Sequence, residues 1–179
     1  KLQLYLHIPF CVRKCAYCDF LSFPAAEEIR KEYVNVLIRQ IQQSGLEKRQ
    51  VSSVFFGGGT PSILAGEEVA RLMEAVRASF CLMDDAEITM EANPGTLDQE
   101  KLTLLKRAGM NRLSIGLQSA NENELKILGR IHSLDQFLEN YRAARMAGFD
   151  NINVDLMSAL PGQTVESWRE TLERVLALE

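Results

Sequence analysis

The chain of 179 residues has no dense basic tract, no long apolar run and no even spread of cysteines. Its 20 basic and 24 acidic side chains give a net charge of −4, which does not support a nucleic-acid-binding surface. No apolar run approaches the roughly 20 residues of a membrane span, and no signal-peptide pattern opens the chain. The remaining composition, 46% hydrophobic and 25% charged, is that of an ordinary soluble globular domain.

Cysteine is scarce, and three of the four cysteines fall within eight residues, at Cys11, Cys15 and Cys18. Small secreted chains usually spread paired cysteines along their length, so a disulfide framework is not indicated. Three cysteines so close together instead indicate a metal site in a reducing compartment, and we expect a cytoplasmic protein. The remote Cys81 follows an apolar helical stretch, and we expect it to be a buried structural thiol.

Hydrophobic periodicity predicts five strands, each followed by helical sequence. The strands are expected at residues 2–8, 51–56, 86–90, 112–117 and 152–156. Helices are expected at residues 26–44, 67–80, 96–108, 121–128, 133–147 and from 164 to the end of the chain, the third with a capping box of Thr96 and Gln99. Such repeated strand–helix units imply an α/β fold with a parallel sheet and right-handed crossovers.

A polar or glycine-rich feature follows every expected strand. The cysteine run follows the first strand and three glycines, residues 57–59, follow the second, while Glu91, Gln118 and Asp155 lie at the ends of the other three. Ligand contacts in an open sheet concentrate at one switch point, whereas all strand ends of a barrel surround one mouth. The pattern therefore favours a partial (β/α) barrel over residues 1–179, and we expect further chain upstream of Lys1 and further strands beyond Glu179.

Three closely spaced thiolates suit either an iron–sulfur cluster or zinc. In a four-iron cluster they would hold three irons and leave the fourth open to a ligand that is not protein. Zinc would need a fourth ligand, for which His7 is a candidate. Structural zinc sites usually combine two pairs of ligands, however, and the sequence has no second pair. We therefore favour the cluster, with a zinc-stabilised binding module as the alternative.

The spacing Cys-x3-Cys-x2-Cys resembles the signature of the radical S-adenosylmethionine (SAM) superfamily. Further segments, in the same order along the chain, resemble the oxygen-independent coproporphyrinogen III oxidase-like group of that superfamily. They are residues 5–11, 57–61, 91–94, 114–119, 128–132, 153–156 and 160–162. The matching segments span nearly the whole chain, so the resemblance does not depend on the cysteines alone.

The resemblance implies a (β/α)6 barrel, a [4Fe–4S] cluster on Cys11, Cys15 and Cys18, and SAM chelating the open iron. One electron passed from the reduced cluster would then cleave SAM to methionine and a 5′-deoxyadenosyl radical. Arg130 would pair with the SAM carboxylate, for which a guanidinium fork is well suited. The implied cofactor contacts are Tyr5, Tyr17, Gly58, Gly59, Thr60, Glu91, Gln118, Arg130 and Asp155.

One departure narrows the resemblance. Coproporphyrinogen dehydrogenases of the group have a further cysteine two residues after the third, where this sequence has Phe20, and the residue before Cys18 is Tyr17. This form resembles the HemW-type branch, whose members are regarded as haem chaperones. It implies a protein that binds haem or another porphyrin and delivers haem to an acceptor haemoprotein. Coproporphyrinogen III dehydrogenase activity is the alternative, and the sequence indicates neither the haem ligand nor whether SAM is cleaved.

Overall fold

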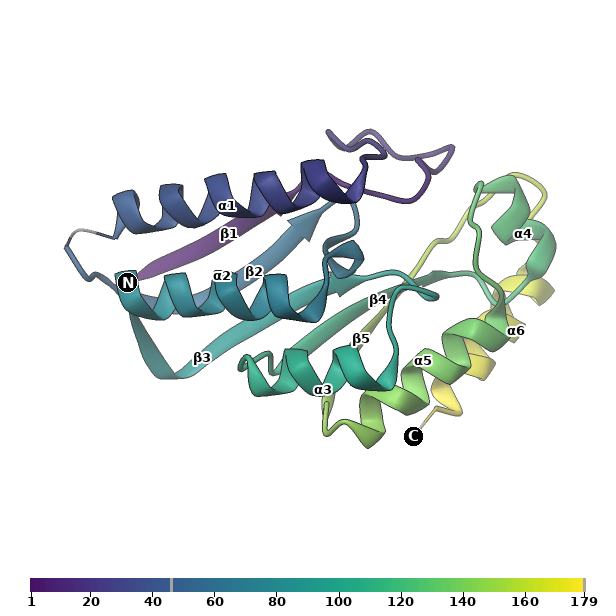
Figure 1. Cartoon of the computed structure of the whole chain (residues 1–179). Coiled ribbons are helices and arrows are strands. Elements are labelled where there is room, and N and C mark those ends of the chain that lie inside the picture. Colours follow the sequence, from purple (N-terminus) through teal and green to yellow (C-terminus); the bar gives the residue numbers. More distant parts are fainter. Residues whose placement is uncertain (46, 179) are drawn as a thin grey trace.

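A computed structural model describes residues 1–45 and 47–178 (Figure 1). In this part of the chain the strands are β1 (Leu2–Ile8), β2 (Gln50–Gly58), β3 (Cys81–Ala92), β4 (Arg112–Gln118) and β5 (Asn151–Leu156). The helices are α1 (Glu27–Ser44), α2 (Gly66–Ser79), α3 (Gln99–Arg107), α4 (Glu122–Ile127), α5 (Leu134–Met146) and α6 (Val165–Leu176). A short 3₁₀ helix, η1 (Pro61–Ile63), follows β2.

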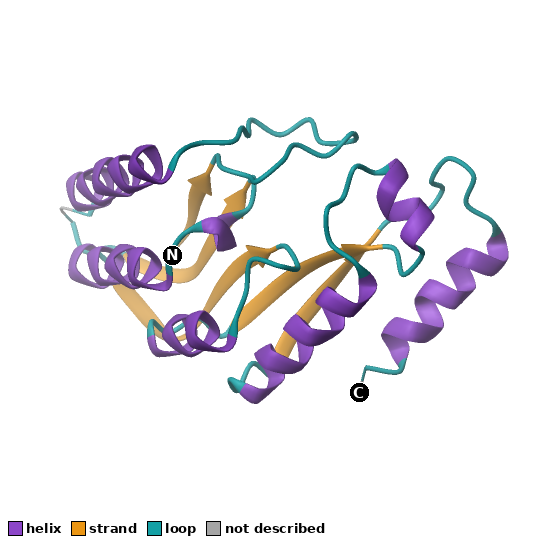
Figure 2. Ribbon diagram, turned by 45° about the vertical axis from the view of Figure 1, so that its right-hand side comes forward, coloured by secondary structure: helices purple, strands orange, loops and turns teal. Residues whose placement is uncertain are grey.

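The sheet is parallel throughout, and its strand order is β1-β2-β3-β4-β5. A doubly wound open sheet reverses its order at a switch point, whereas a barrel adds each strand beside the previous one. Figure 2 shows the strands as a curved sheet with helices along its outer side. The α/β partial barrel expected from the sequence is therefore confirmed.

Alternating side chains give the sheet two different faces. One face packs against the helices and forms the core, with Phe56 and Met90 from the strands and Leu72, Leu102 and Phe137 from the helices fully buried. The other, concave face is largely polar. Pairing aligns Tyr5, Phe55, Thr89 and Arg112 in one row across it, and Glu91, Ser114 and Asn153 in the next. The interior of the barrel is therefore built to meet a polar ligand or solvent.

Three local expectations were wrong. Cys81 is exposed because α2 ends at Ser79 and the chain is already extended at Phe80, so Cys81 is the first residue of β3, at the amino-terminal end of the strand. Asp98, not Thr96, caps α3, because its side chain accepts the Lys101 N–H. The last helix, α6, ends at Leu176, and Glu179 lies outside the described residues.

A buried carboxylate ties the loops after β4 and β5 together. Glu124 of α4 accepts hydrogen bonds from Ser119 Oγ (2.6 Å), Gln163 Nε2 (2.9 Å) and Ser167 Oγ (2.6 Å). Burial raises the pKa of Glu124, but these three hydrogen bonds outweigh it and hold the pKa below its usual value. The bonds join α4, the β5–α6 loop and α6, and so they fix the rim of the barrel beside Gln118.

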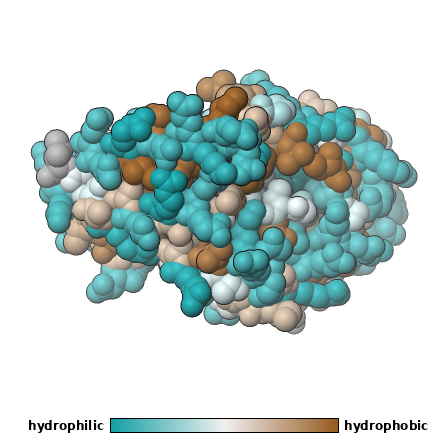
Figure 3. Space-filling view, viewed as in Figure 1, coloured by the Kyte–Doolittle hydropathy of each residue, from teal (hydrophilic) through white to brown (hydrophobic). Residues whose placement is uncertain are grey.

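None of the helices that the structure describes is both long and apolar enough to cross a bilayer. The face of the molecule in Figure 3 is mainly hydrophilic, with hydrophobic atoms in separate patches.

Candidate functional site

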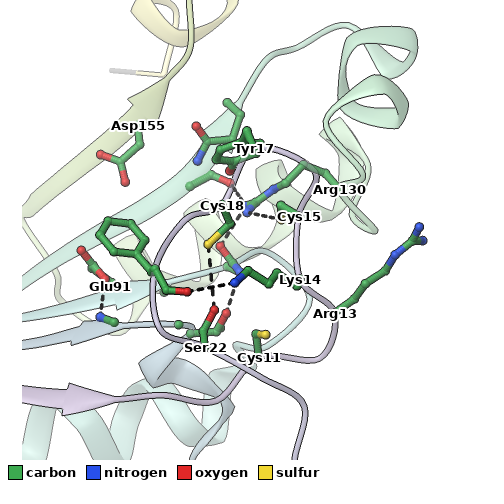
Figure 4. Close-up of a pocket in the computed structure, with 18 of the residues that line it drawn as sticks. Cys11, Arg13, Lys14, Cys15, Tyr17, Cys18, Ser22, Glu91, Arg130 and Asp155 are labelled. Carbon is green, nitrogen blue, oxygen red and sulfur yellow. Dashed lines mark hydrogen bonds between the residues drawn. The ribbon is translucent and has the colours of Figure 1, made fainter.

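A cavity opens at the carboxyl ends of the strands and gathers nearly all of the predicted site residues (Figure 4). The three clustered cysteines line it, together with Tyr17, Gly58, Gly59, Thr60, Glu91, Gln118, Arg130 and Asp155. These residues come from all five strand ends or the loops that follow them, apart from Arg130, which lies between α4 and α5. The sequence did not single out Ser22, Asn93, Ser114 and Gly116, which also line the cavity. Asn93, Ser114 and Gly116 lie within the segments 91–94 and 114–119 that resemble the family, and this resemblance could have identified them.

Tyr5 is the exception among the predicted residues, because it does not line this cavity. Its ring stacks beside Phe55 at a centroid distance of 6.0 Å, and its hydroxyl lies 3.5 Å from His7 Nδ1. Tyr5 precedes the end of β1 by three residues, so it lies deeper along the concave face than the strand ends. A cofactor contact by Tyr5 therefore stays a prediction.

The cysteine loop is tied down at both ends and in the middle. Phe23 N–H donates to Pro9 O (2.9 Å) and Cys11 N–H donates to Phe23 O (3.2 Å), which closes the loop on itself. Ala16 N–H donates to Leu128 O (3.0 Å), which joins the loop to the end of α4. The loop therefore has a defined path across the cavity although it contains no helix or long strand.

The three thiols have distinct surroundings. Cys15 Sγ accepts a hydrogen bond from Arg130 Nη1 (3.7 Å), and Cys18 Sγ lies 3.9 Å from Ser22 Oγ. Cys11 is buried, and burial raises the pKa of its thiol, with a further rise from the neighbouring Cys18 and Cys15 that a Ser22 hydrogen bond partly offsets. Bound iron would supply the positive charge that favours thiolate ligands at these positions.

The donor set fits a cluster with one open iron. Cys81 begins β3 and pairs with Gln50, while Met90 pairs with Phe56 six residues further along β2, so Cys81 is about 20 Å from the cavity end of the strand. Neither His7 nor His132 lines the cavity. Among the described residues that line the cavity, no histidine and no further cysteine accompanies the three thiols as the fourth ligand that structural zinc sites usually take from His or Cys. A four-iron cluster spaces its thiolates more widely than one ion does, and the cavity offers it three.

The glycine segment brings bare backbone against the cysteine loop. Gly59 N–H donates to Ile8 O (2.9 Å) and Thr60 N–H donates to Phe10 O (2.7 Å). A Cβ on Gly59 would lie 2.5 Å from Phe10 O, and Gly58 has a φ of +122°. Only glycine meets both demands without strain, so the close approach of β2 to the cysteine loop depends on these residues.

Two carboxylates face the cavity from β3 and β5. Asp155 accepts hydrogen bonds from Ser114 Oγ (3.2 Å) and Asn153 Nδ2 (2.6 Å), which fix its orientation. Glu91 Oε2 accepts the Gly58 N–H (3.1 Å). Burial raises the pKa of Glu91, the Gly58 hydrogen bond lowers it by a smaller amount, and the charge of Asp155 then raises it and that of His7 lowers it. The pair is suited to accept hydrogen bonds from amines or hydroxyl groups of a ligand.

Gln118 adopts a left-handed backbone conformation with a φ of +72°, although it is not glycine. The pairing register of β4 with β5 shifts between Gly116 and Gln118, and Gln118 O accepts the Met157 N–H (2.9 Å). Non-glycine residues in this region are strained and concentrate at functional sites. The strain turns Gln118 at the strand end, where it lines the cavity.

We expect Glu91→Gln to stabilise the ligand-free protein at neutral pH, because it removes a half-buried charge that Asp155 repels. A carboxyl whose folded pKa is raised favours folding below its unfolded pKa and loses that contribution as pH rises through the folded pKa. The gain should therefore shrink as pH falls toward 4. Urea unfolding of both proteins at several pH values measures it, and an equal gain at pH 4 and pH 7 would contradict the assignment.

Comparison with known proteins decides the family. A model of the radical SAM superfamily matches residues 5–175. The chain belongs to the radical SAM superfamily. Membership implies a [4Fe–4S] cluster and SAM as cofactors, as the resemblance had predicted, and the donor set described above fits that cluster.

Curated relatives extend this finding. The chain is 44% identical over 183 residues to the haem chaperone HemW of Escherichia coli, covering 99% of this chain and 48% of that protein. It is 41% identical to the mitochondrial radical S-adenosyl methionine domain-containing protein 1 of Mus musculus, over 98% of this chain and 40% of that protein. The chain thus spans about half the length of the curated relatives it matches.

Among solved structures, coproporphyrinogen III oxidase (HemN) from Escherichia coli superimposes with a TM-score of 0.90 at 34% identity. The match covers 99% of this chain and 42% of that chain. The predicted resemblance to the HemW and HemN group of radical SAM proteins is confirmed.

Proposed function

We propose that this chain is the cluster- and SAM-binding part of a haem chaperone of the HemW type. The observation that carries the proposal is the similarity to four curated haem chaperones at 38–44% identity over nearly the whole chain. Phe20, at the position where dehydrogenases of the group have another cysteine, supports the same branch. We further propose a cytoplasmic location and treat residues 1–179 as one partial barrel.

In this proposal Cys11, Cys15 and Cys18 bind three irons of the cluster, and SAM completes the coordination of the fourth iron. The cluster would supply a single electron for reductive chemistry when it is bound. Gly58, Gly59 and Thr60 would line the methionine end of SAM, and Arg130 would lie near its carboxylate. Glu91 and Asp155 would accept hydrogen bonds from its amino and ribose hydroxyl groups, and the Gln118 amide could accept or donate. Tyr17 and Tyr5 would pack beside the cofactor.

The rim of the cavity would suit a large apolar ligand. Exposed hydrophobic side chains are concentrated in the cysteine loop, at Val12, Tyr17, Phe20, Leu21 and Phe23. Phe20 is 67% exposed and also lines the cavity. Two cations, Arg13 and Lys14, lie on the same loop and would complement the propionates of haem. The axial ligand of the haem iron and the acceptor haemoprotein are not assigned.

The second candidate function is oxygen-independent coproporphyrinogen III dehydrogenation. The structural similarity to HemN, with a TM-score of 0.90, favours it. Phe20 opposes it, because a phenylalanine cannot replace a thiol as a ligand or hydrogen-bond partner. Haem binding and protoporphyrinogen formation by the full-length protein distinguish the two functions.

The full-length protein should bind haem stoichiometrically, with a Soret band, and transfer it to an apo-haemoprotein. It should not form protoporphyrinogen from coproporphyrinogen III under anaerobic conditions with SAM and a reductant. Absence of haem binding would refute the chaperone proposal, and formation of protoporphyrinogen would establish the alternative. A sample heated beyond unfolding is the control for non-specific adsorption of haem.

A further inference from the structure

Arg130 is held between three separate segments of the cavity wall. Its Nη2 donates to Asn93 Oδ1 (2.8 Å), after β3, and to Gly116 O in β4, while its Nη1 donates to Cys15 Sγ (3.7 Å). Figure 4 shows the guanidinium beside Cys15, with this contact drawn. A group anchored by two oxygen acceptors has little freedom to leave the sulfur atom.

The surroundings of Arg130 reinforce this position. Asn93 Nδ2 donates to Thr60 Oγ1 (2.9 Å), which turns the amide oxygen of Asn93 toward Arg130. His132, two residues further along, is buried, with its Nε2 3.2 Å from Leu117 O. Burial and the nearby Arg130 lower the pKa of His132 to about 4, so this imidazole is neutral at pH 7 and adds no second charge.

The three proposed cluster ligands are therefore not equivalent. Within the described residues, a cationic hydrogen-bond donor reaches Cys15 Sγ alone, whereas the neutral hydroxyl of Ser22 serves Cys18 and Cys11. Lys14 is close in sequence, but its ammonium group donates to Phe20 O (3.1 Å). Arg13 extends away from the thiols in Figure 4. Lys14 therefore acts on Cys11 only through its charge, whereas Arg130 donates a charged hydrogen bond to Cys15 Sγ.

We propose that Arg130 is a positioning residue for the cluster, holding a guanidinium N–H on the Cys15 sulfur and raising the midpoint potential of the cluster. Reduction adds negative charge that spreads onto the sulfur ligands, and hydrogen bonds to those sulfurs and nearby cations stabilise the reduced form. This role is distinct from binding the SAM carboxylate, because it operates in the absence of SAM. The inference rests on the cluster ligands proposed above.

The test is a redox titration of the full-length protein, reconstituted anaerobically and followed by electron paramagnetic resonance without SAM. Arg130→Gln should move the midpoint to a more negative potential, so that the ratio of reduced to oxidised cluster at the wild-type midpoint falls about tenfold, or 59 mV for one electron. Arg130→Lys keeps the positive charge but loses the forked guanidinium group, so its midpoint potential should lie between those of the wild-type protein and Arg130→Gln. Arg13→Gln, which removes a cation from the same loop, is the matched control and should leave the midpoint unchanged.

A variant of Asn93 separates the effect of the Arg130 charge from the effect of the hydrogen bond that anchors Arg130. Asn93→Ala removes an anchor of Arg130 but leaves the guanidinium available to Cys15, so its midpoint should stay closer to wild type than that of Arg130→Gln. An unchanged midpoint in Arg130→Gln, or an equal shift in Arg13→Gln, would overturn the inference. Loss of the cluster from both Arg130 variants would also overturn it, since three thiolates should suffice for retention. A wild-type protein that forms no cluster would instead refute the proposed function.

Discussion

Replacing Cys11, Cys15 or Cys18 individually with alanine is expected to abolish cluster retention. The structure places these three thiols on one cavity, and Cys81 is at the far end of β3, about 20 Å away. Within the described residues no spare thiol can therefore replace a missing ligand. Iron and sulfide content after anaerobic reconstitution measure the loss, and each variant should retain close to none.

Cys81→Ala is the matched control for this experiment, because it removes a thiol without touching the cavity. Its iron content and its visible spectrum should equal those of the wild-type protein. Cys81 is exposed, so the substitution should also leave the stability almost unchanged. Loss of iron from Cys81→Ala, or full retention in any variant of the other three, would show that the ligands are assigned incorrectly.

Gly58→Ala is expected to destabilise the protein strongly and to weaken SAM binding. Gly58 has a φ of +122°, and an added Cβ would lie 2.8 Å from Ile8 O and 2.8 Å from the His7 ring. Backbone strain costs of the order of 1–3 kcal/mol, and the clash adds about 1–3 kcal/mol. The Gly58 N–H that binds Glu91 would shift with the backbone, and so would the cavity wall.

Gly95→Ala separates the backbone strain of a positive φ from the steric clash of an added Cβ. Gly95 also has a positive φ, +84°, but an added Cβ would meet nothing within 4 Å. Urea unfolding should therefore give a smaller loss for Gly95→Ala than for Gly58→Ala, by about 1–3 kcal/mol. Calorimetric titration with SAM should show weaker binding for Gly58→Ala alone. Equal losses of stability in the two variants would mean that the crowding at Gly58 relaxes without cost.

The fold was predictable because its signals are local. Each strand carries its own hydrophobic pattern, and the glycine and polar residues that follow the strands mark the same edge of the sheet. The sequence pattern predicted the ends of helices and strands less well than their positions. Helical periodicity in residues 67–80 gave no sign that the chain would extend at Phe80, which is why Cys81 was predicted to be buried. Thr96 and Asp98 are both good caps, and only the path of the chain selects Asp98.

The candidate site was predicted mainly through motifs, and it was incomplete where partners lie far apart in sequence. Cys15 and Arg130 meet across 115 residues, and Ser119 and Thr171 meet across 52. Hydrophobic periodicity holds no information about such pairs, because it reports only the face on which a residue lies. The depth of a residue along its strand is likewise not given by periodicity: Tyr5 lies on the concave face but outside the cavity, and its cofactor contact stays a prediction.

The sequence by itself determined the order of strands and helices, the parallel barrel and the cysteines that face its mouth, because these follow from periodicity and spacing along one segment at a time. Only the tertiary structure decided that Arg130 lies on Cys15, that Glu124 joins three segments, and that Cys81 is remote from the other thiols. Those outcomes depend on how separate segments are brought together when the sheet curves, and that curvature results from the packing of all the strands and helices together.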